Sequence, residues 1–437
     1  MSIEWVTLLL FGGMLLILVS GLPIAFALGG WCMVVGLLLY GPRVFPLAVY
    51  GTISIMAYEN LLCVPLFVFM GMMLYYSGMA DELYGTFQNW LGMVPGGLAS
   101  ATVGTCAVIA AMEGSETTAI LTLGKLALPA MRKRGYHKNI AVGCIQAGAS
   151  LGFLIPPSII AILYAIIAKQ SIGRLFAGGV FPGLLLATLY ITYITVRCKI
   201  QPHLGPPVPK AERPPWREKM KSLQYLALPA TIIAVVIGAI LLKITTPVEA
   251  SSIGAAASLA VVAIKRRLTR KVFTEALMTT LQLTAVAMWI FMAALTFGRL
   301  YDLLGAKEVT EAIIFSLPLG PWGILALMQL SFFVLGTALD DTAILFITMP
   351  IYIPIIQELG FNPVWFGILY LINMQLAYST PPFGYCLFLM KAVCPPDISL
   401  GDVYRSYIGF ALCDATGLII VMLFPQIVLW LPNMLFG

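Results

Sequence analysis

Four carboxylates interrupt two otherwise apolar stretches of this chain, and glycine and hydroxyl residues surround them. The first stretch contains Glu113-Gly-Ser-Glu-Thr-Thr118, and the second contains Gly336-Thr-Ala-Leu-Asp-Asp-Thr342. A charge at membrane depth is costly, so an intramembrane carboxylate is a functional-site hypothesis by default. These groups suit direct cation binding or protonation. The structural alternative is that they stabilise the N-termini of half-helices through the helix dipole.

Two Pro-Pro pairs follow these stretches, in Leu151-Gly-Phe-Leu-Ile-Pro-Pro-Ser158 and in Leu376-Ala-Tyr-Ser-Thr-Pro-Pro-Phe-Gly384. Proline removes a backbone donor and disfavours the helical conformation of the preceding residue. Each pair therefore predicts an unwound segment inside a span, with a simple kink as the alternative. Freed carbonyls and hydroxyls suit a hard cation such as Na⁺, whereas helix N-termini attract anions.

The helix breakers of the first half recur at a constant offset in the second half. Pro129, Pro156 and Pro157 return 225 positions later as Pro354, Pro381 and Pro382, and no gap is needed to align them. Helix breakers at matching places in two apolar halves are typical of a secondary transporter, with substrate and ions bound at the broken helices. The hydroxyls available there are those of Ser115, Thr117, Ser158, Thr337, Thr342, Ser379 and Thr380.

The composition indicates a polytopic membrane protein. The chain has 437 residues, 60% of them hydrophobic and 10% charged, whereas soluble domains carry about 25% charged residues. The net charge of +6 comes from basic loops, which set membrane orientation, so nucleic-acid binding is not expected. The apolar runs are 4–20, 23–40, 62–78, 97–131, 139–168, 174–197, 222–242, 248–264, 274–300, 320–357, 363–391 and 405–435.

Runs 97–131 and 320–357 do not fit simple membrane spans because their centres are polar. Each side of a centre has about 16 residues, or roughly 24 Å of helix, against a hydrocarbon core of about 30 Å. We therefore expect two re-entrant helical hairpins with polar tips near the middle of the membrane. The alternative is one tilted and kinked span in each case. Runs 139–168 and 363–391 are the helices that the Pro-Pro pairs break.

The fold expected is an all-α membrane protein with two inverted repeats, each containing a re-entrant hairpin and a broken helix. Residues 1–197 form the first repeat, 198–221 a basic, proline-rich cytoplasmic linker and 222–437 the second repeat. Residues 132–138 are rich in Lys and Arg, but the equivalent segment 357–363 has no positive charge. Equivalent loops should therefore face opposite sides of the membrane. With the basic loops in the cytoplasm, both termini lie outside.

These motifs, taken in order, resemble the large membrane subunit of tripartite ATP-independent periplasmic (TRAP) transporters. The resemblance covers essentially the whole chain. It is carried in the first half by Gly114-Ser115, Leu128-Pro-Ala-Met-Arg-Lys-Arg-Gly-Tyr136, Leu154-Ile-Pro-Pro-Ser158, Ser171-Ile-Gly-Arg-Leu-Phe176 and Gly183. In the second half it is carried by Leu335-Gly-Thr-Ala-Leu-Asp340, Gly360-Phe-Asn-Pro-Val-Trp-Phe-Gly367 and Thr380-Pro-Pro-Phe-Gly384.

The resemblance implies an elevator-type, Na⁺-coupled importer of small organic anions such as dicarboxylates, sugar acids or sulfonates. It implies a bacterial inner-membrane location, a small four-helix membrane partner and a soluble periplasmic binding protein, and no enzymatic activity. Two or more Na⁺ ions are expected. The family ion sites lie between each hairpin tip and its broken helix. By position they fall on Gly114, Ser115, Gly152 and Pro156, and on Gly336, Asp340, Thr380 and Pro381.

The first tip departs from the family pattern. Family members commonly carry Ser-Gly-Ser-Ser, whereas this chain has Glu113-Gly-Ser-Glu116. We expect Glu116, together with Thr337 at the second tip, on the cation side of the site. Ser115, Thr117 and Ser158 are expected to bind the substrate anion, with Thr342 and Ser379 in the second repeat.

Three other functions remain open from the sequence. One is a scaffold subunit without transport, which the four converging polar breaks disfavour. A self-sufficient symporter of Na⁺ and divalent anions would share the inverted architecture and need no binding protein. An intramembrane aspartyl protease would use Asp302 with Asp340 or Asp341, but the Gly-x-Gly-Asp motif that it requires is absent. The internal repeat also has no role in such a protease.

The charge asymmetry generates a topology prediction. In a cysteine-free background, Arg134→Cys should react with an impermeant thiol reagent from the cytoplasmic side, and Leu359→Cys from the periplasmic side. The reason is that only the first of these equivalent loops carries positive charge. Reaction of both cysteines from the same side would contradict the inverted arrangement.

Overall fold

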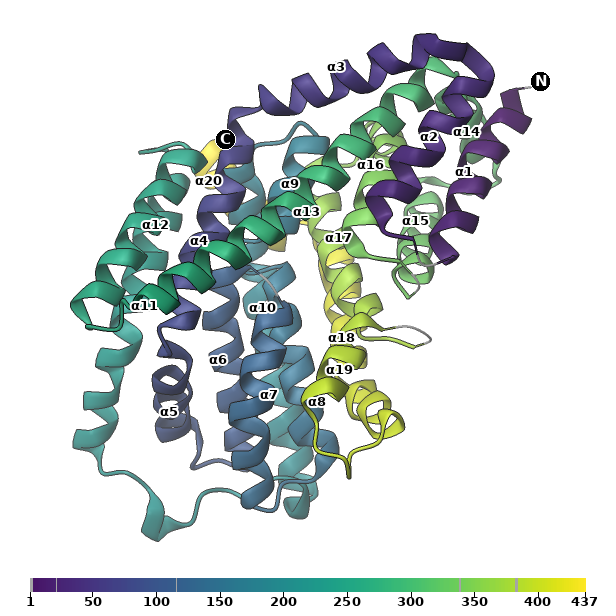
Figure 1. Cartoon of the computed structure of the whole chain (residues 1–437). Helices are drawn as coiled ribbons and strands as arrows, with labels where there is room; N and C mark the ends of the chain where they lie inside the picture. Colours follow the sequence, from purple (N-terminus) through teal and green to yellow (C-terminus); the bar gives the residue numbers. More distant parts are fainter. Residues whose placement is uncertain (1–2, 21, 115, 338, 382–383) are drawn as a thin grey trace.

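The computed structural model describes residues 3–20, 22–114, 116–337, 339–381 and 384–437, and every regular element within these ranges is a helix (Figure 1). Seven of the described helices are long and apolar enough to cross a membrane, or eight if the bent pair 309–316 and 321–336 forms one span. The expectation of an all-helical polytopic membrane protein is confirmed.

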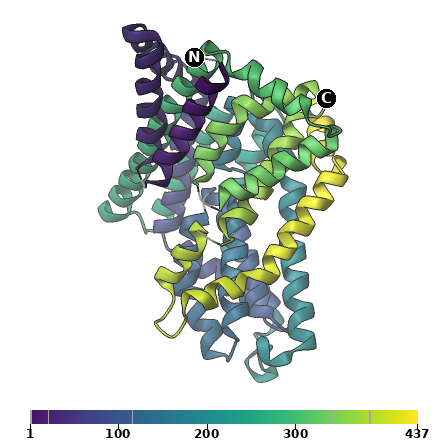
Figure 2. The ribbon, with the colours of Figure 1, turned by 90° about the vertical axis from the view of Figure 1, so that its right-hand side faces the viewer.

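The N-terminal region packs on the rest of the molecule from one flank (Figure 2). It contains α1 (Ile3–Val19), α2 (Ile24–Tyr40), the 3₁₀ turn η1 (Gly41–Arg43), α3 (Val44–Met56), the 3₁₀ turn η2 (Glu59–Leu62) and α4 (Cys63–Tyr76). Helix α3 lies outside the apolar runs expected from the sequence. Its sequence is strongly apolar, but Gly41-Pro42 separates it from the preceding helix and it has only 13 residues.

The first hairpin and the first part of the first broken helix (138–150) lie in the lower half of Figure 1, and the second part (159–167) lies above them. The elements are α5 (Met79–Leu91), α6 (Gly97–Glu113), α7 (Glu116–Lys133), α8 (Lys138–Ser150), the 3₁₀ turn η3 (Leu151–Phe153), α9 (Ile159–Ile167) and α10 (Ile172–Ile200). Both arms of the hairpin pack against α8. The sequence prediction placed these boundaries to within a few residues because glycine and proline mark them.

Three long helices join the two halves of the chain. After the short 3₁₀ turns η4 (Pro202–Leu204) and η5 (Lys210–Glu212) come α11 (Trp216–Leu241), α12 (Pro247–Ile264) and α13 (Arg270–Leu303). Helix α13 has 34 residues and crosses the face of the molecule diagonally (Figure 1). It contacts α2, α3 and α4 on one side and α16 on the other, so it borders both the N-terminal region and the second hairpin.

The order of the first hairpin region recurs in the C-terminal half. Its elements are α14 (Ala306–Ser316), α15 (Pro321–Gly336), α16 (Asp341–Glu358), α17 (Pro363–Tyr378), α18 (Tyr385–Val393), α19 (Leu400–Leu423) and α20 (Gln426–Phe436). Helices α7 and α16 have 18 residues each, and α9 and α18 have nine each. The run 405–435, expected as one apolar segment, is divided at Phe424-Pro425, because proline lacks the donor that would continue α19.

The two broken helices run in opposite directions. At one end Lys138, the first residue of α8, forms an ion pair of 2.6 Å with Asp402, which follows α18 in the chain. At the other end the Tyr164 hydroxyl of α9 donates to the carbonyl of Pro363, the first residue of α17, at 2.6 Å. The start of each broken helix therefore lies beside the end of the other.

Candidate functional site

The first hairpin tip packs directly on the first break. Gly114 ends α6 in the left-handed conformation with φ of +64°, and its N–H donates to the Ala110 carbonyl at 2.8 Å. A Cβ atom at this position would lie 2.2 Å from the Pro157 carbonyl oxygen. Glycine is therefore required both for the turn and for the approach of the two backbones. Ser115, predicted to bind substrate or ion, lies outside the described residues.

The first break is a 3₁₀ turn followed by the Pro-Pro pair. Gly152 and Pro156, both predicted ion-site residues, are buried within it. The Ser158 hydroxyl donates to the Phe153 carbonyl at 2.7 Å and accepts from the Ala161 N–H at 3.3 Å. Ser158 thus caps α9, and its side chain has partners without a substrate.

Two tyrosines of α17 hold the second hairpin tip. The Tyr378 hydroxyl donates to an Asp340 carboxylate oxygen at 2.6 Å and accepts from the Asp341 N–H at 2.8 Å. The Tyr370 hydroxyl donates to the Asp341 carbonyl at 2.5 Å. Asp340 also caps α16 by accepting from the Thr342 N–H at 3.2 Å. The second tip is therefore tied to the broken helix through hydrogen bonds, whereas the first tip is held by close backbone packing.

The second break begins where α17 ends at Tyr378. A Cβ at Gly336 would lie 2.6 Å from the Ala377 Cβ, so this tip also approaches its break closely. The Thr337 and Thr380 hydroxyls donate to the carbonyls of Val334 and Leu376 at 2.8 and 2.6 Å. Pro381 is the last described residue before the gap and is exposed.

The two tips and the two breaks come together. The Phe153 ring of the first break contacts the Tyr378 ring of the second, with centroids 5.6 Å apart. Glu116 begins α7, and its carboxylate interacts electrostatically with Asp340 and Asp341. Thr117 interacts with Tyr385 at the start of α18. Three carboxylates of two hairpins therefore surround one region of the interior, where repulsion between them favours a bound cation.

Sequence reasoning missed the tyrosines that bridge tip and break. Tyr370 and Tyr378 are two of 18 tyrosines in the chain, and no spacing rule singles them out. Their role follows only from the register of α17 against α16. A buried carboxylate, Asp414 on α19, was also missed, although a lone acidic residue in an apolar run was a usable signal.

Outside the membrane-spanning helices, ion pairs fix the base of the first hairpin. Arg132 at the end of α7 donates to the Asp397 carboxylate at 2.7 Å. This hydrogen bond lowers the pKa of Asp397 below its usual value. Arg134 pairs with Glu212 of the linker at 2.8 Å. Several positive charges of the predicted cytoplasmic loop thus have acidic partners in other segments.

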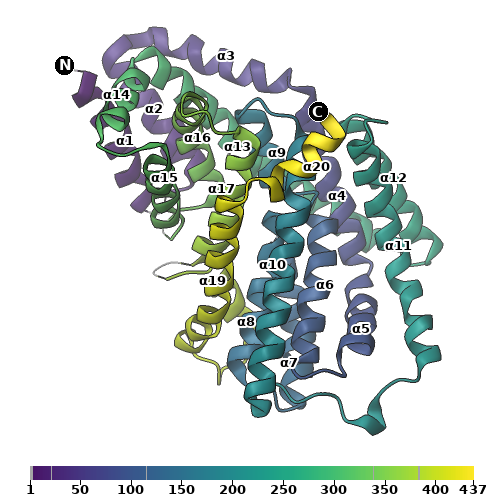
Figure 3. The same ribbon diagram turned by 180° about the vertical axis from the view of Figure 1, so that it is seen from behind.

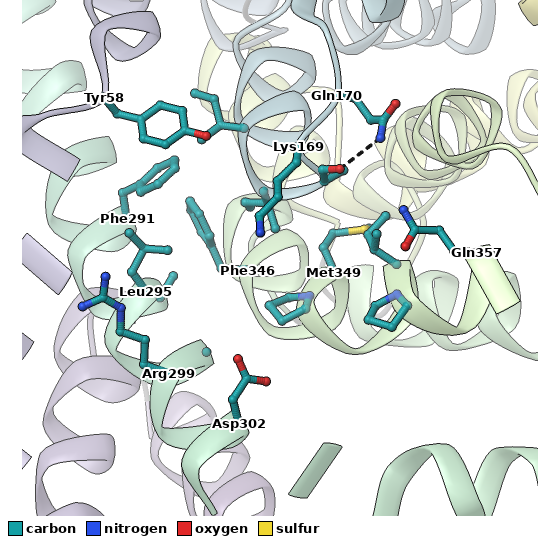
Figure 4. A pocket seen from close by; sticks show the side chains of 18 residues that line it. Tyr58, Lys169, Gln170, Phe291, Leu295, Arg299, Asp302, Phe346, Met349 and Gln357 are labelled. Atoms are coloured by element: carbon teal, nitrogen blue, oxygen red, sulfur yellow. Dashed lines mark hydrogen bonds between the residues drawn. The ribbon is translucent and has the colours of Figure 1, made fainter. Parts of the chain in front are cut away.

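A cavity of about 510 Å³ lies between α13 and the pair α9 and α16, away from the tips (Figure 4). None of the predicted site residues lines it. The Lys169 side chain extends into the cavity, and the Arg299 side chain of α13 borders it and donates to the Ser54 hydroxyl at 2.7 Å. The remaining lining is mostly apolar, including Phe291, Phe346 and Met349.

Comparison with known proteins shows the family to which the chain is similar. Residues 11–427 match the family model described as the DctM component of tripartite ATP-independent periplasmic transporters. A C4-dicarboxylate TRAP transporter large permease protein of Pseudomonas aeruginosa is 30% identical over 380 residues, covering 86% of this chain and 87% of that protein. A sialic acid TRAP transporter large permease protein of Vibrio cholerae is 29% identical over 381 residues, with 86% and 87% covered.

A solved structure also shares the fold. The YdaH transporter of Alcanivorax borkumensis, described as having an unusual topology, matches with a TM-score of 0.61 and 14% sequence identity. The match covers 97% of this chain and 98% of that one. At this identity the likeness concerns the fold alone.

The contact between Gly114 and Pro157 generates a prediction with an internal control. Gly114→Ala should lower thermal stability more than Gly135→Ala, measured as the melting temperature of the purified protein. Both glycines have positive φ, and the left-handed conformation costs alanine roughly 1–2 kcal/mol at either position. Only at Gly114 does the new methyl group meet backbone, which adds about 1–3 kcal/mol, since Gly135 faces open space. Equal losses for the two variants would contradict the tight contact between tip and break.

Proposed function

The chain belongs to the DctM component family of tripartite ATP-independent periplasmic transporters, and we propose that it imports a small organic anion in symport with Na⁺. The observation that carries this proposal is the convergence of two hairpin tips on two broken spans around Glu116, Asp340 and Asp341. Broken helices in the middle of a transporter supply the half-helix ends and free carbonyls that bind substrate and coupling ions. The family match also favours transport over the intramembrane protease alternative.

The cation sites are proposed at the two contacts between tip and break. In the first repeat the ligands would come from Gly114, Ser115, Glu116, Gly152 and Pro156. In the second they would come from Gly336, Thr337, Asp340, Thr380 and Pro381. Carboxylate, hydroxyl and carbonyl oxygens are the donors that a hard cation prefers, and all three kinds are present. The Tyr378 hydroxyl supports this assignment because it holds Asp340 in position beside the break.

The substrate is proposed to be a dicarboxylate, sugar acid or sulfonate that binds between the tips. Related proteins are named for C4-dicarboxylate, sialic acid and isethionate transport. Ser115, Thr117, Ser158, Thr342 and Ser379 are the proposed contacts, with N-termini of the half-helices attracting the anion. To contact the substrate, the Ser158 hydroxyl would have to give up hydrogen bonds by which it caps α9.

We propose that two partners complete the transporter in a bacterial inner membrane. One is a small four-helix membrane subunit, and the other is a soluble periplasmic binding protein that delivers the anion. The binding protein separates this proposal from a self-sufficient Na⁺ symporter with the same fold. Both termini are proposed to be periplasmic.

Transport is proposed to follow an elevator mechanism, with inverted repeats forming the moving domain. The opposite directions of the two broken helices support the inversion. The cavity between α13 and the pair α9 and α16 supports a sliding boundary there, because it leaves part of that boundary unpacked.

Reconstitution tests the function and the second ion site together. The purified complex in liposomes should take up a dicarboxylate, sugar acid or sulfonate only with its binding protein and an inward Na⁺ gradient. Asp340→Asn should raise the Na⁺ concentration for half-maximal uptake by about tenfold, as expected when a ligand worth 1.4 kcal/mol is lost. Glu358→Gln, an exposed carboxylate change at the far end of α16, is the control. Uptake without a binding protein would favour the self-sufficient symporter, and an unchanged Na⁺ response in Asp340→Asn would leave Asp340 as a helix cap.

The unusual first tip generates a separate prediction about coupling. The Glu116 carboxylate shares the cavity with the proposed anion and would repel it unless a cation neutralises the charge. Anion binding then depends on the cation, which is the thermodynamic requirement for coupling. Glu116→Gln should therefore permit substantial uptake at Na⁺ concentrations too low to support wild-type uptake. If the variant keeps the wild-type Na⁺ and pH profiles, Glu116 acts only as a favourable charge at the start of α7.

A further inference from the structure

A second buried carboxylate lies behind the second tip, where α10, α17 and α19 pack together (Figure 3). Asp414 of α19 is fully buried. One of its oxygens accepts from the Tyr190 hydroxyl and from the Gln375 amide, the latter at 3.1 Å, and the other accepts from the Tyr407 hydroxyl. Three donors from three helices therefore converge on one carboxylate, which is the pattern that accommodates its ionised form.

The charge of Asp414 has no basic partner among the described residues, since no Lys, Arg or His there forms an ion pair with it. Asp414 lies in the middle of α19 and so receives no help from a helix N-terminus. Hydrogen bonds from neutral groups lower the cost of a buried charge but do not cancel it. A bound cation beside this cluster would cancel it.

Two oxygens in the same place lack partners. Within the described part of the chain, Gln375 Oε1 and Ser379 Oγ are buried and make no hydrogen bond. Gln375 is fully buried, Ser379 is 1% exposed, and Ser379 is the C-cap residue of α17, four positions after Gln375. The Gln375 amide nitrogen already donates to Tyr190 at 2.5 Å and to Asp414, so exchanging its nitrogen and oxygen would place the oxygen against the carboxylate. The orphaned acceptor is therefore Oε1.

The Tyr407 hydroxyl joins these groups. It donates to Asp414, lies 3.5 Å from the Gln375 carbonyl oxygen and lies near the Ser379 hydroxyl without forming a hydrogen bond to it. The two unpartnered oxygens therefore belong to residues that are linked to the buried Asp414 carboxylate, Gln375 directly and Ser379 through Tyr407. Unpartnered buried acceptors are costly, and a cation that they ligate would remove that cost.

We propose that Gln375, Ser379 and Tyr407 form an additional Na⁺ site, with Asp414 as the balancing charge. This assigns the Ser379 hydroxyl to a cation in place of the anion contact proposed for it above. The site is distinct from the proposed tip sites, because its charge comes from α19 and not from a hairpin. It rests on the proposed Na⁺-coupled function and extends it. Ser379 follows Tyr378 directly, so a cation here would fix the end of α17 that holds Asp340.

The test is direct Na⁺ binding by the purified transporter, measured as the rise in melting temperature with Na⁺ at constant ionic strength, choline being the replacement ion. The Glu116→Gln/Asp340→Asn background weakens both proposed tip sites. In this background the melting temperature should still rise with Na⁺. Adding Ser379→Ala should raise the Na⁺ concentration that gives half of this rise by about tenfold, which corresponds to about 1.4 kcal/mol of lost binding free energy. Adding Asp414→Asn should abolish this component.

Ser406→Ala is the matched control in the same background. Ser406 is buried on α19 beside Tyr407, but its hydroxyl already donates to the Val403 carbonyl at 2.6 Å. This variant should keep the Na⁺ half-saturation of the Glu116→Gln/Asp340→Asn background. The Ser379→Ala variant loses only one hydroxyl. If its Na⁺ half-saturation is unchanged, the additional site is wrong, but the proposed Na⁺-driven uptake is not affected. A wild-type protein without any Na⁺ response would overturn both this site and the Na⁺ coupling of the proposed function.

Discussion

The structure depends on one constraint: polar backbone exposed by a broken helix inside a membrane must find partners within the protein. Here each break is covered by a hairpin tip. Gly114 brings the first tip against Pro157, and Tyr378 hydrogen-bonds the second tip through Asp340 and Asp341. Each hairpin tip therefore covers the polar backbone of one break, and both breaks lie where the two halves of the protein meet. The same packing that satisfies the backbone also assembles a polar centre in an apolar protein.

The two tips meet this constraint in a similar way, with one difference. Both tips approach their breaks closely at a glycine, Gly114 against Pro157 and Gly336 against Ala377. The second tip adds side-chain hydrogen bonds from Tyr370 and Tyr378. Glu116 contributes a carboxylate at the first tip that interacts with Asp340 of the second.

Much of this organisation follows from local sequence. Glycine and proline determine where the helices end, so the hairpin and broken-helix boundaries could be predicted to within a few residues. The polar partners could not, because they depend on the register between helices distant in sequence. Tyr378 contacts Asp340 across 38 positions, and Tyr190 contacts Asp414 across 224. Helix α3 was not expected although its sequence is strongly apolar, because Gly41-Pro42 ends the preceding run and no full-length apolar run follows before Glu59.

The length of α13 has a consequence for the surrounding lipid. With 34 residues it is roughly 51 Å long, well beyond a hydrocarbon core of about 30 Å. A helix of this length must tilt or extend past the acyl region, and it borders the N-terminal helices and the second hairpin alike. Its tilt is therefore coupled to bilayer thickness through hydrophobic mismatch. A change in lipid acyl-chain length would therefore change the tilt of α13, and with it the packing between the N-terminal helices and the second hairpin.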